Sequence, residues 1–236
     1  MAQHVVPLHQ DIHRQLKLTT KPSYHEFADR HLLPLSVHEF CRASAEYPIV
    51  FVKDSESGQF KAVVLLSLKP GINLYAVDQA SAPVYWPQAL CNYPLVLIAD
   101  PKLNDQYHVG IHTTSSQLTE QSGEALFTVS GEETPFLQHR KQALIQSFEQ
   151  QQVTDAVIQL LLKLQLLQPY RFSIELQGES LQLDGIYSVS EQQLQQLSSV
   201  QFDELRQRGL LAAVYAQINS LHQFHRLAAR HVQSVT

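Results

Sequence analysis

The chain has 236 residues, 44% of them hydrophobic and 17% charged, which is enough apolar sequence to bury a substantial core. Its formal net charge of −5, without any run of Lys or Arg, argues against a nucleic-acid partner, because binding phosphates requires a basic surface. Two cysteines without CxxC spacing favour a reducing compartment, and no apolar stretch reaches the roughly 20 residues of a membrane-spanning helix, so we expect a cytoplasmic protein without a transmembrane segment.

The first 48 residues are expected to form a loose arm. They carry short apolar pairs separated by histidines and prolines, and they lack the unbroken apolar region of a secretory signal. Only residues 36–46 have a helical pattern, with Ser36 in N-cap position and Glu39 three residues later.

The next part of the chain is expected to form a mostly antiparallel sheet of about four to five strands. Its segments are rich in β-branched and apolar residues, and the first two flank a turn at Gly58, which predicts a hairpin. The predicted strands cover residues 48–54, 61–68, 73–78, 94–100 and 107–114.

Residues 84–94, VYWPQALCNYP, connect the third and fourth of these strands and hold the only tryptophan of the chain. Pro87 suits the first turn of a helix and Pro94 ends one, so we expect a short helix that carries the aromatic side chains. Cys91 falls toward the C-terminal end of this helix, where the dipole disfavours a thiolate, and is expected to be a packing residue.

The C-terminal part predicts helices on both sides of one further hairpin. Helical spacing covers residues 135–150 and 153–167, with Thr154 as a cap of the second helix. A hairpin at 170–190 turns at QGES, and two more helical segments follow, with Ser199 or Asp203 as possible caps.

Together these elements predict an α+β fold, with a mostly antiparallel sheet in the N-terminal half and an α-rich C-terminal part that contains the second hairpin. We expect a single domain over residues 1–236, in which residues 1–130 are rich in strands and residues 131–236 are rich in helices.

His108 and His112 form the candidate metal or proton-transfer site. They are four residues apart on a predicted strand, and even spacing places both side chains on the same face. The alternative interpretation is two half-exposed strand histidines without a ligand. Because the sequence contains no GxSxG, GxxxxGK[ST] or GxGxxG motif, we expect no catalytic residue and no cofactor.

The order of short motifs along the chain resembles that of the SapC family of bacterial proteins. The matching segments are EFxxAxxxYPIVFV, LxPGxNLY, YxPxxLxxYP, GxxLF and a C-terminal DGIYxVxExxLxxL, in this order over more than 200 residues. The family pattern reaches His13, Tyr47, Pro48, Pro70, Asn73, Leu74, Tyr85, Pro87, Tyr93, Pro94, Gly123, Phe127, Gly185, Gly209, Tyr215, Gln217 and Ser220. The family commonly has an arginine pair where this chain has Cys91 and Asn92, so an arginine-dependent anion site is not expected here.

The resemblance implies a single-domain protein without an established reaction. The family takes its name from a protein linked to a paracrystalline surface layer. Family genes often lie near TonB-dependent receptors and flavin-dependent halogenase-like proteins, which implies an accessory role beside such systems.

Three hypotheses for the function follow. The first is a non-catalytic binding or accessory protein that recognises a peptide, glycan or protein partner through an aromatic surface, because Tyr and Trp are typical anchors of binding surfaces. The second is a metal-dependent oxygenase or hydrolase that uses His108 and His112, and the third is a structural protein of a surface layer, which would lie at the cell surface. We prefer the first, although the aromatic side chains could equally pack in the core. Its predicted ligand-binding residues are Asn73, Tyr75, Tyr85, Trp86 and Tyr93.

Overall fold

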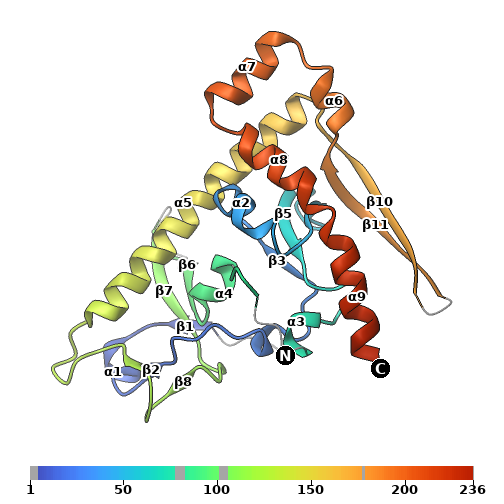
Figure 1. Ribbon diagram of the computed structural model, residues 1–236. Coiled ribbons are helices and arrows are strands. Elements are labelled where there is room, and N and C mark those ends of the chain that lie inside the picture. Colours follow the sequence, from blue (N-terminus) through green and yellow to red (C-terminus); the bar gives the residue numbers. More distant parts are fainter. Residues whose placement is uncertain (1–4, 78–82, 101–105, 177–178, 236) are drawn as a thin grey trace. The chain divides into compact units, whose positions relative to one another are not determined.

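The computed structural model describes residues 5–77, 83–100, 106–176 and 179–235 (Figure 1). Its internal contacts divide the chain into two compact units, each built from two separate stretches of sequence. The first unit comprises residues 1–26 and 88–149, and the second comprises residues 27–87 and 150–236. Each is described by itself. The expectation of a single domain over residues 1–236 stays a prediction.

The first unit contains two small antiparallel sheets, and one of them packs against a long helix. The larger sheet has the order β1 (Val5–Pro7), β7 (Tyr107–His112), β6 (Leu95–Ala99), and the smaller has the order β8 (Leu118–Thr119), β2 (Lys17–Leu18), β9 (Glu124–Ala125). Its helices are α1 (Gln10–His13), α4 (Gln88–Asn92) and the first half of α5 (Pro135–Lys163).

The register of β6 and β7 decides which side chains meet α5. Leu95 lies opposite Ile111, and Leu97 lies opposite Val109, so these four apolar side chains share one face of the sheet. Leu95 and Ile111 are buried in one cluster with Leu137 and Leu144 of α5, and Leu97 and Val109 pack at its edge. The core of this unit therefore lies between the sheet and α5.

The second unit is built on a five-stranded antiparallel sheet. Its order is β10 (Leu167–Leu176), β11 (Glu179–Val189), β4 (Ile49–Lys53), β5 (Phe60–Leu65), β3 (Leu32–Pro34). The associated helices are α2 (Phe40–Ala43), α3 (Leu74–Val77), the second half of α5, α6 (Glu191–Gln195), α7 (Ser199–Gln207), α8 (Leu211–Ser220) and α9 (Gln223–Val235), with a 3₁₀ turn at Val37–Glu39. A further 3₁₀ turn, His25–Phe27, contains residues of both units.

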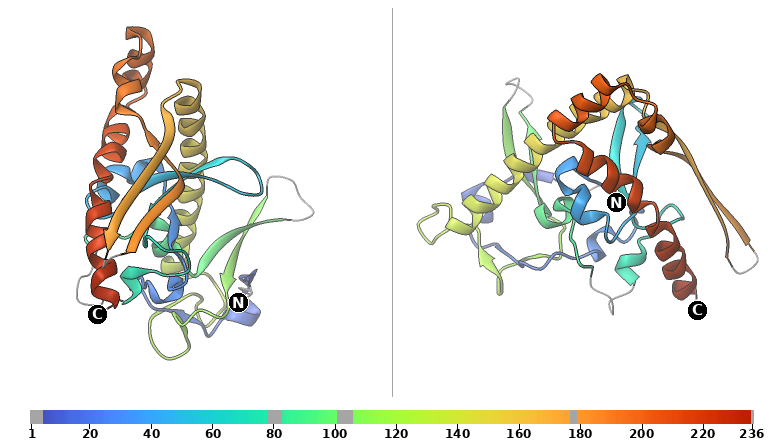
Figure 2. Two further views of the ribbon diagram at one scale, coloured as in Figure 1. Left: turned by 90° about the vertical axis from the view of Figure 1, so that its right-hand side faces the viewer. Right: turned by 45° about the horizontal axis from the view of Figure 1, so that its top comes forward.

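Two side chains fix the C-terminal helices onto this sheet. The fully buried Gln217 amide of α8 donates to the Ile49 carbonyl at 2.9 Å and accepts the Val189 N–H at 3.0 Å, which joins α8 to β4 and β11. Phe224 of α9 stacks on Phe172 of β10 with ring centroids 4.4 Å apart. Figure 2 shows α9 and the long β10–β11 hairpin from two further directions.

The α+β class is confirmed, and so are the strands expected at 48–54, 61–68, 94–100 and 107–114, the second hairpin and the short helix within 84–94. The arrangement in one sheet was wrong, because β4 and β5 belong to the second unit while β6 and β7 pair in the first. The loose N-terminal arm was also wrong, because β1, β2 and β3 each pair with later strands.

Four local predictions need correction. Residues 74–77 form helix α3 rather than a strand, because the Asn73 side chain accepts the Tyr75 N–H and starts a helical turn; Asp78 lies outside the described residues. The two helices expected at 135–150 and 153–167 are one helix, so Thr154 is an interior residue and not a cap. The N-cap of α7 is Ser198 rather than Ser199 or Asp203.

Candidate functional site

Asn73 and Tyr75, two of the predicted binding residues, are buried in the second unit. The Asn73 amide donates to the Phe27 carbonyl at 3.1 Å and accepts the Tyr75 N–H at 2.9 Å. The Tyr75 hydroxyl donates to the Glu46 carbonyl, and the Arg230 guanidinium lies over the Tyr75 ring, 4.4 Å from its centroid. Burial raises the pKa of the Tyr75 hydroxyl above its ordinary value. Packing therefore accounts for both side chains.

Tyr85 and Trp86 are half-buried in the same unit. The Tyr85 hydroxyl donates to Glu39 Oε1 at 2.8 Å, and the Arg42 guanidinium lies over the Tyr85 ring at 5.2 Å. The Tyr85 carbonyl accepts the Tyr47 hydroxyl at 2.6 Å. These contacts fix the segment before α4 in place and leave part of each ring accessible.

Tyr93 belongs to the first unit, where it is buried. Its hydroxyl donates to Glu26 Oε2 at 3.0 Å, and its ring lies against that of His112 with centroids 5.1 Å apart. Burial alone would raise the pKa of Glu26, but the hydrogen bonds from Ser116, Tyr93 and Ser115 outweigh it and lower the pKa. The ligand-binding roles of the five predicted residues stay predictions.

His108 and His112 lie on β7 with the even spacing that the sequence indicated, and they have different partners. His108 is exposed, and its Nε2 lies 2.6 Å from Asp100 Oδ2, whereas His112 is half-buried against Tyr93. Within the described residues, no group of three or more His, Cys, Asp or Glu side chains could hold a metal ion. The metal-dependent hypothesis therefore gains no ligand set from the described part of the chain.

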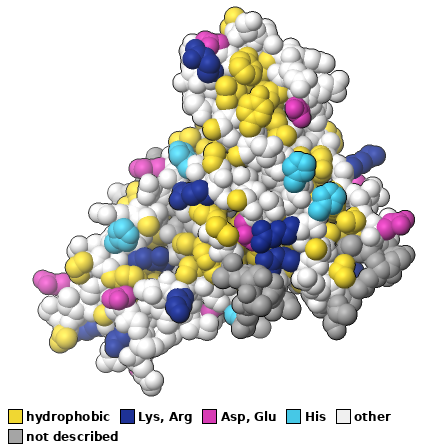
Figure 3. Space-filling view, viewed as in Figure 1, with side chains coloured by type: hydrophobic (Ala, Val, Ile, Leu, Met, Phe, Trp, Pro, Cys, Tyr) yellow, Lys and Arg dark blue, Asp and Glu magenta, His cyan; other side chains and the backbone are white. Residues whose placement is uncertain are grey.

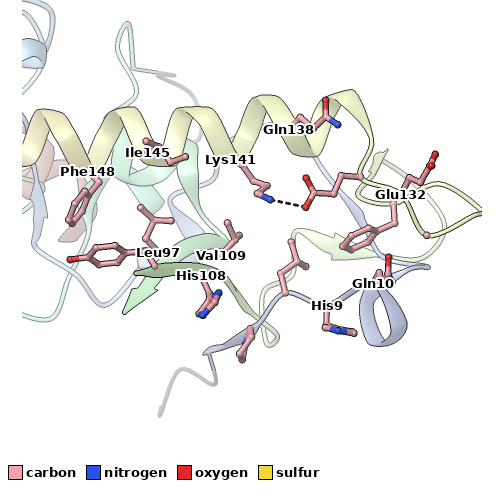
Figure 4. Close-up of a pocket in the computed structure, with 16 residues that line it drawn as sticks. His9, Gln10, Leu97, His108, Val109, Glu132, Gln138, Lys141, Ile145 and Phe148 are labelled. Carbon is pink, nitrogen blue, oxygen red and sulfur yellow. Dashed lines mark hydrogen bonds and ion pairs between the residues drawn. The ribbon is translucent and has the colours of Figure 1, made fainter. Parts of the chain in front are cut away.

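A groove of about 1040 Å³ lies in the first unit between α5 and the sheet β1–β7–β6 (Figure 4). We call it the α5 groove. Its lining residues are Pro7, Leu8, His9, Gln10, Leu97, Tyr107, His108, Val109, Phe127, Gly131, Glu132, Glu133, Gln138, Lys141, Ile145 and Phe148. Pockets of several hundred Å³ with mostly apolar walls and a few polar groups are typical of ligand sites.

One end of the α5 groove is apolar and aromatic. Figure 4 shows Ile145 and Phe148 of α5 facing Leu97 and Val109 of the strands. The Tyr107 and Phe148 rings lie with centroids 4.7 Å apart. Tyr107 is 45% exposed and Ile145 50% exposed, so this end presents large apolar side chains to solvent.

The register explains why the groove opens at this end. At one end of the sheet, Leu137 and Leu144 of α5 pack in one cluster with Leu95 and Ile111. Along the same face, the pair Leu97 and Val109 follows, and the next pair is Ala99 and Tyr107. Ala99 carries only a methyl group, so Tyr107 has no large neighbour on β6 at this position. His108 alternates to the opposite face, and Figure 4 shows its ring pointing away from α5.

The other end of the α5 groove is charged. Lys141 Nζ lies 2.7 Å from Glu133 Oε1, and both side chains are partly exposed. The exposed Glu132 carboxylate makes no ion pair within the described residues. One lysine and two glutamates are among the lining residues. The Arg14 guanidinium lies beside Gly131 of the lining, so positive and negative formal charges balance at this end.

Two groove residues were identified in the sequence for other reasons, His108 as a metal candidate and Phe127 within the family pattern, and the rest were missed. Gln138, Lys141, Ile145 and Phe148 recur at helical spacing, which is typical of any helix face that packs against a core. The available signal was the helical spacing of apolar and polar residues in α5 together with a strand that begins at Tyr107, but this signal does not distinguish a filled interface from an open one.

Exposed apolar side chains also lie elsewhere on the surface. Figure 3 shows hydrophobic side chains over α7 and α8, where Val200 and Tyr215 are exposed. The hollow beside α7 has an otherwise polar lining of Ser199, Asp203, Glu204, Gln207 and Arg208. No helix in the described residues combines the length and hydropathy needed to cross a bilayer. The α5 groove is therefore the candidate functional site.

Comparisons with known proteins give one match. The search of curated proteins and the search of solved structures each found no match. The family model SapC matches residues 8–227, which is nearly the whole chain and includes all residues of the α5 groove except Pro7. The chain therefore belongs to the SapC family.

Proposed function

We propose that this protein is a non-catalytic binding protein that holds an apolar segment of a peptide or protein partner in the α5 groove. The observation that carries the proposal is the exposure of Tyr107 and Ile145 beside a 1040 Å³ hollow whose walls are mostly apolar. Concave sites with mostly apolar walls and a few polar groups are the usual place for ligands to bind.

The chemistry of the walls favours a peptide over a glycan. Sugars need several hydrogen-bond partners at each ring, and at the apolar end of the groove Leu97, Val109 and Ile145 offer none. An apolar peptide side chain gains free energy from burial against these walls, at about 25 cal/mol for each Å² removed from water.

The proposal extends to the setting of the protein. We infer a cytoplasmic location, with the cell surface as the alternative, and an accessory role beside TonB-dependent receptor or flavin-dependent halogenase-like systems. A partner protein of such a system would supply the apolar segment. The residues named in the aromatic segment, Tyr85 and Trp86, are a second contact surface under this proposal because part of each ring is accessible.

The test uses N-phenyl-1-naphthylamine, a neutral apolar fluorophore, and two peptides. The wild-type protein is expected to bind the fluorophore at one site, and acetyl-Ser-Phe-Ser-Leu-Ser-amide is expected to displace it, whereas acetyl-pentaserine-amide is not. Ile145→Glu places a charge in the apolar wall and is expected to weaken fluorophore binding at least tenfold, because burying an unpaired carboxylate is costly.

Val200→Glu is the matched control. Val200 is 81% exposed on α7, so the same change in chemistry is expected to leave fluorophore binding unchanged. The proposal is wrong if wild type and Ile145→Glu bind the fluorophore equally, or if the Phe-Leu peptide does not compete for it.

A further inference from the structure

We infer that the outer edge of β10 pairs with β10 of a second copy of this chain, in an antiparallel register that is two-fold symmetric about Ser173. The pairing concerns the second unit, so it goes beyond the proposed function and does not depend on the α5 groove.

The hairpin of β10 and β11 continues as a two-stranded ribbon beyond the rest of its sheet. Among the described residues, β11 pairs with β4 only at Ile186 and Tyr187. Figure 1 shows the hairpin projecting from the other strands. In the same part of the chain, β10 pairs with no strand other than β11, and no backbone hydrogen bond joins its outer edge to another element. Two-stranded ribbons are marginally stable in water, and open strand edges are templates for further strands.

Strand β10 is regular where it would pair. The pairs Tyr170–Ile186 and Phe172–Leu183 enclose one residue of β10 and two residues of β11, so the bulge belongs to β11. The outer edge of β10 is therefore not interrupted by the bulge.

The side chains of β10 divide into a polar and an apolar face. Arg171, Ser173 and Glu175 are exposed, whereas Phe172 is buried and Ile174 is half-buried. Helix α9 packs against the Phe172 ring, so its contacts with the strand lie on the apolar face and not on the polar one.

The charges of β10 select the register. An antiparallel strand that pairs with its own copy about a two-fold axis has one residue that faces itself. With Ser173 at the axis, Arg171 of each copy lies opposite Glu175 of the other, and Phe172 lies opposite Ile174 on the apolar face. An axis at Arg171 or at Glu175 would place like charges opposite each other, and the other centres along β10 would place both charges opposite uncharged residues. This charge complementarity favours a second copy as the strand that pairs here.

The neighbouring charges leave Arg171 and Glu175 available. Within the described residues, neither side chain makes an ion pair or a hydrogen bond, and no ion pair joins Arg171 to Asp184 in the bulge opposite it. Glu179 and Asp184 belong to β11, so a paired strand of the second copy would lie about 10 Å from them, where salt at about 0.1 M screens most of their effect. Arg226 of α9 is already paired with a buried carboxylate.

Charge reversal tests the register. Arg171→Glu and Glu175→Arg each place like charges opposite each other at both charged positions of the symmetric pair, so each is expected to raise the dissociation constant of the dimer about fivefold or more. An equimolar mixture of the two variants pairs opposite charges at both positions, and is expected to restore dimers at concentrations at which each variant alone is monomeric. Sedimentation velocity over about 5 to 500 μM compares these samples with the wild type, which is expected to dimerise in this range because the interface is small.

A cysteine pair tests the symmetry axis without changing any charge. In Ser173→Cys, the new side chain faces itself in the second copy with Cβ atoms about 5 Å apart, so mild oxidation is expected to link two copies. Gln182→Cys is the matched control, because Gln182 lies opposite Ser173 on β11 and so one strand away from the edge. It is expected to give no more linked dimer than the wild type, in which Cys41 is exposed.

The inference is wrong if the wild type stays monomeric at every concentration, which would leave the β10 edge to a strand of another protein. It is also wrong if both single variants dimerise as the wild type does. If circular dichroism shows that either variant is unfolded, the cysteine pair decides, and equal linkage of Ser173→Cys and Gln182→Cys overturns the inference. Fluorophore binding in the α5 groove is measured separately, so these outcomes leave the proposed function unaffected.

Discussion

Asn73 is a fully buried polar side chain whose donor and acceptor are both used inside the second unit. Its amide connects the turn at Phe27 to the first residues of α3. A buried amide of this kind stabilises a fold mainly because removing it leaves its two backbone partners without a replacement for water.

We expect Asn73→Ala to lower the free energy of unfolding by about 2 kcal/mol, because the Phe27 carbonyl loses this donor and the Tyr75 N–H loses this acceptor. Asn73→Asp keeps the acceptor but places a carboxylate opposite the Phe27 carbonyl, and we expect it to cost at least as much. Urea unfolding followed by circular dichroism measures both changes. Asn219→Ala, at an exposed position of α8, is the control and is expected to change stability by less than about 0.5 kcal/mol.

Residues 73–78 also show where local sequence is ambiguous. The apolar and polar alternation of NLYAVD fits a strand, but Asn73 is a strong helix-initiating residue. In the structure its side chain accepts the Tyr75 N–H, and helix α3 begins at Leu74. The role predicted for Tyr75 depended on exposure, and the sequence does not show that its hydroxyl would find a buried carbonyl at Glu46. Side-chain chemistry was predictable from the sequence at these positions, and exposure was not.

Helix α5 is the element whose continuity the sequence did not reveal. Three consecutive glutamines at 150–152 interrupt its apolar pattern, and Thr154 looks like a cap that follows them. In the structure Thr154 is 1% exposed, donates to the Gln150 carbonyl at 2.7 Å and accepts the Val37 N–H at 2.9 Å. A helix-interior threonine thus caps a different element, the 3₁₀ turn at Val37–Glu39.

We expect Thr154→Val, a change of nearly equal volume, to lower the free energy of unfolding by about 1–3 kcal/mol, because the buried Val37 N–H loses its acceptor. Hydrogen exchange is expected to become faster at the Val37 amide in this variant. Thr154→Ser keeps the hydroxyl, so it is expected to preserve protection of Val37 even where the lost methyl group reduces stability. Equal Val37 exchange in Thr154→Val and wild type would contradict this role.

The strands were more predictable than their assignment to sheets. Runs such as IVFVK and FKAVVL identify β4 and β5 from composition alone, because β-branched residues favour extended backbone. Which strands pair depends on contacts between distant parts of the chain, such as Ile186 of β11 with Val52 of β4. The α5 groove was hidden for the same reason, since its walls come from distant parts of the chain, such as Val109 of β7 and Ile145 of α5.

At the scale of the whole molecule, buried histidines occur in both units and link stability to pH. Burial lowers the pKa of His13 in the first unit and of His31 and His231 in the second. A histidine whose pKa is lower in the folded state binds fewer protons there than it does in the unfolded state. The free energy of unfolding is therefore not reduced by this histidine above its unfolded pKa of about 6.5. That free energy decreases as the pH falls from about 6.5 toward the folded pKa values.

We therefore expect the free energy of unfolding to fall between pH 7.5 and pH 5.5, before the carboxylates titrate. Urea midpoints measured at several pH values in this range give the slope, and His31→Gln, which removes one of the three groups, is expected to make the slope shallower. A further loss is expected below about pH 4.5, because hydrogen bonds hold the pKa of Glu26 below its ordinary value and the folded state loses that advantage when Glu26 is protonated. A urea midpoint that stays constant from pH 7.5 to 5.5 would show that none of these histidines is stabilised in its neutral form.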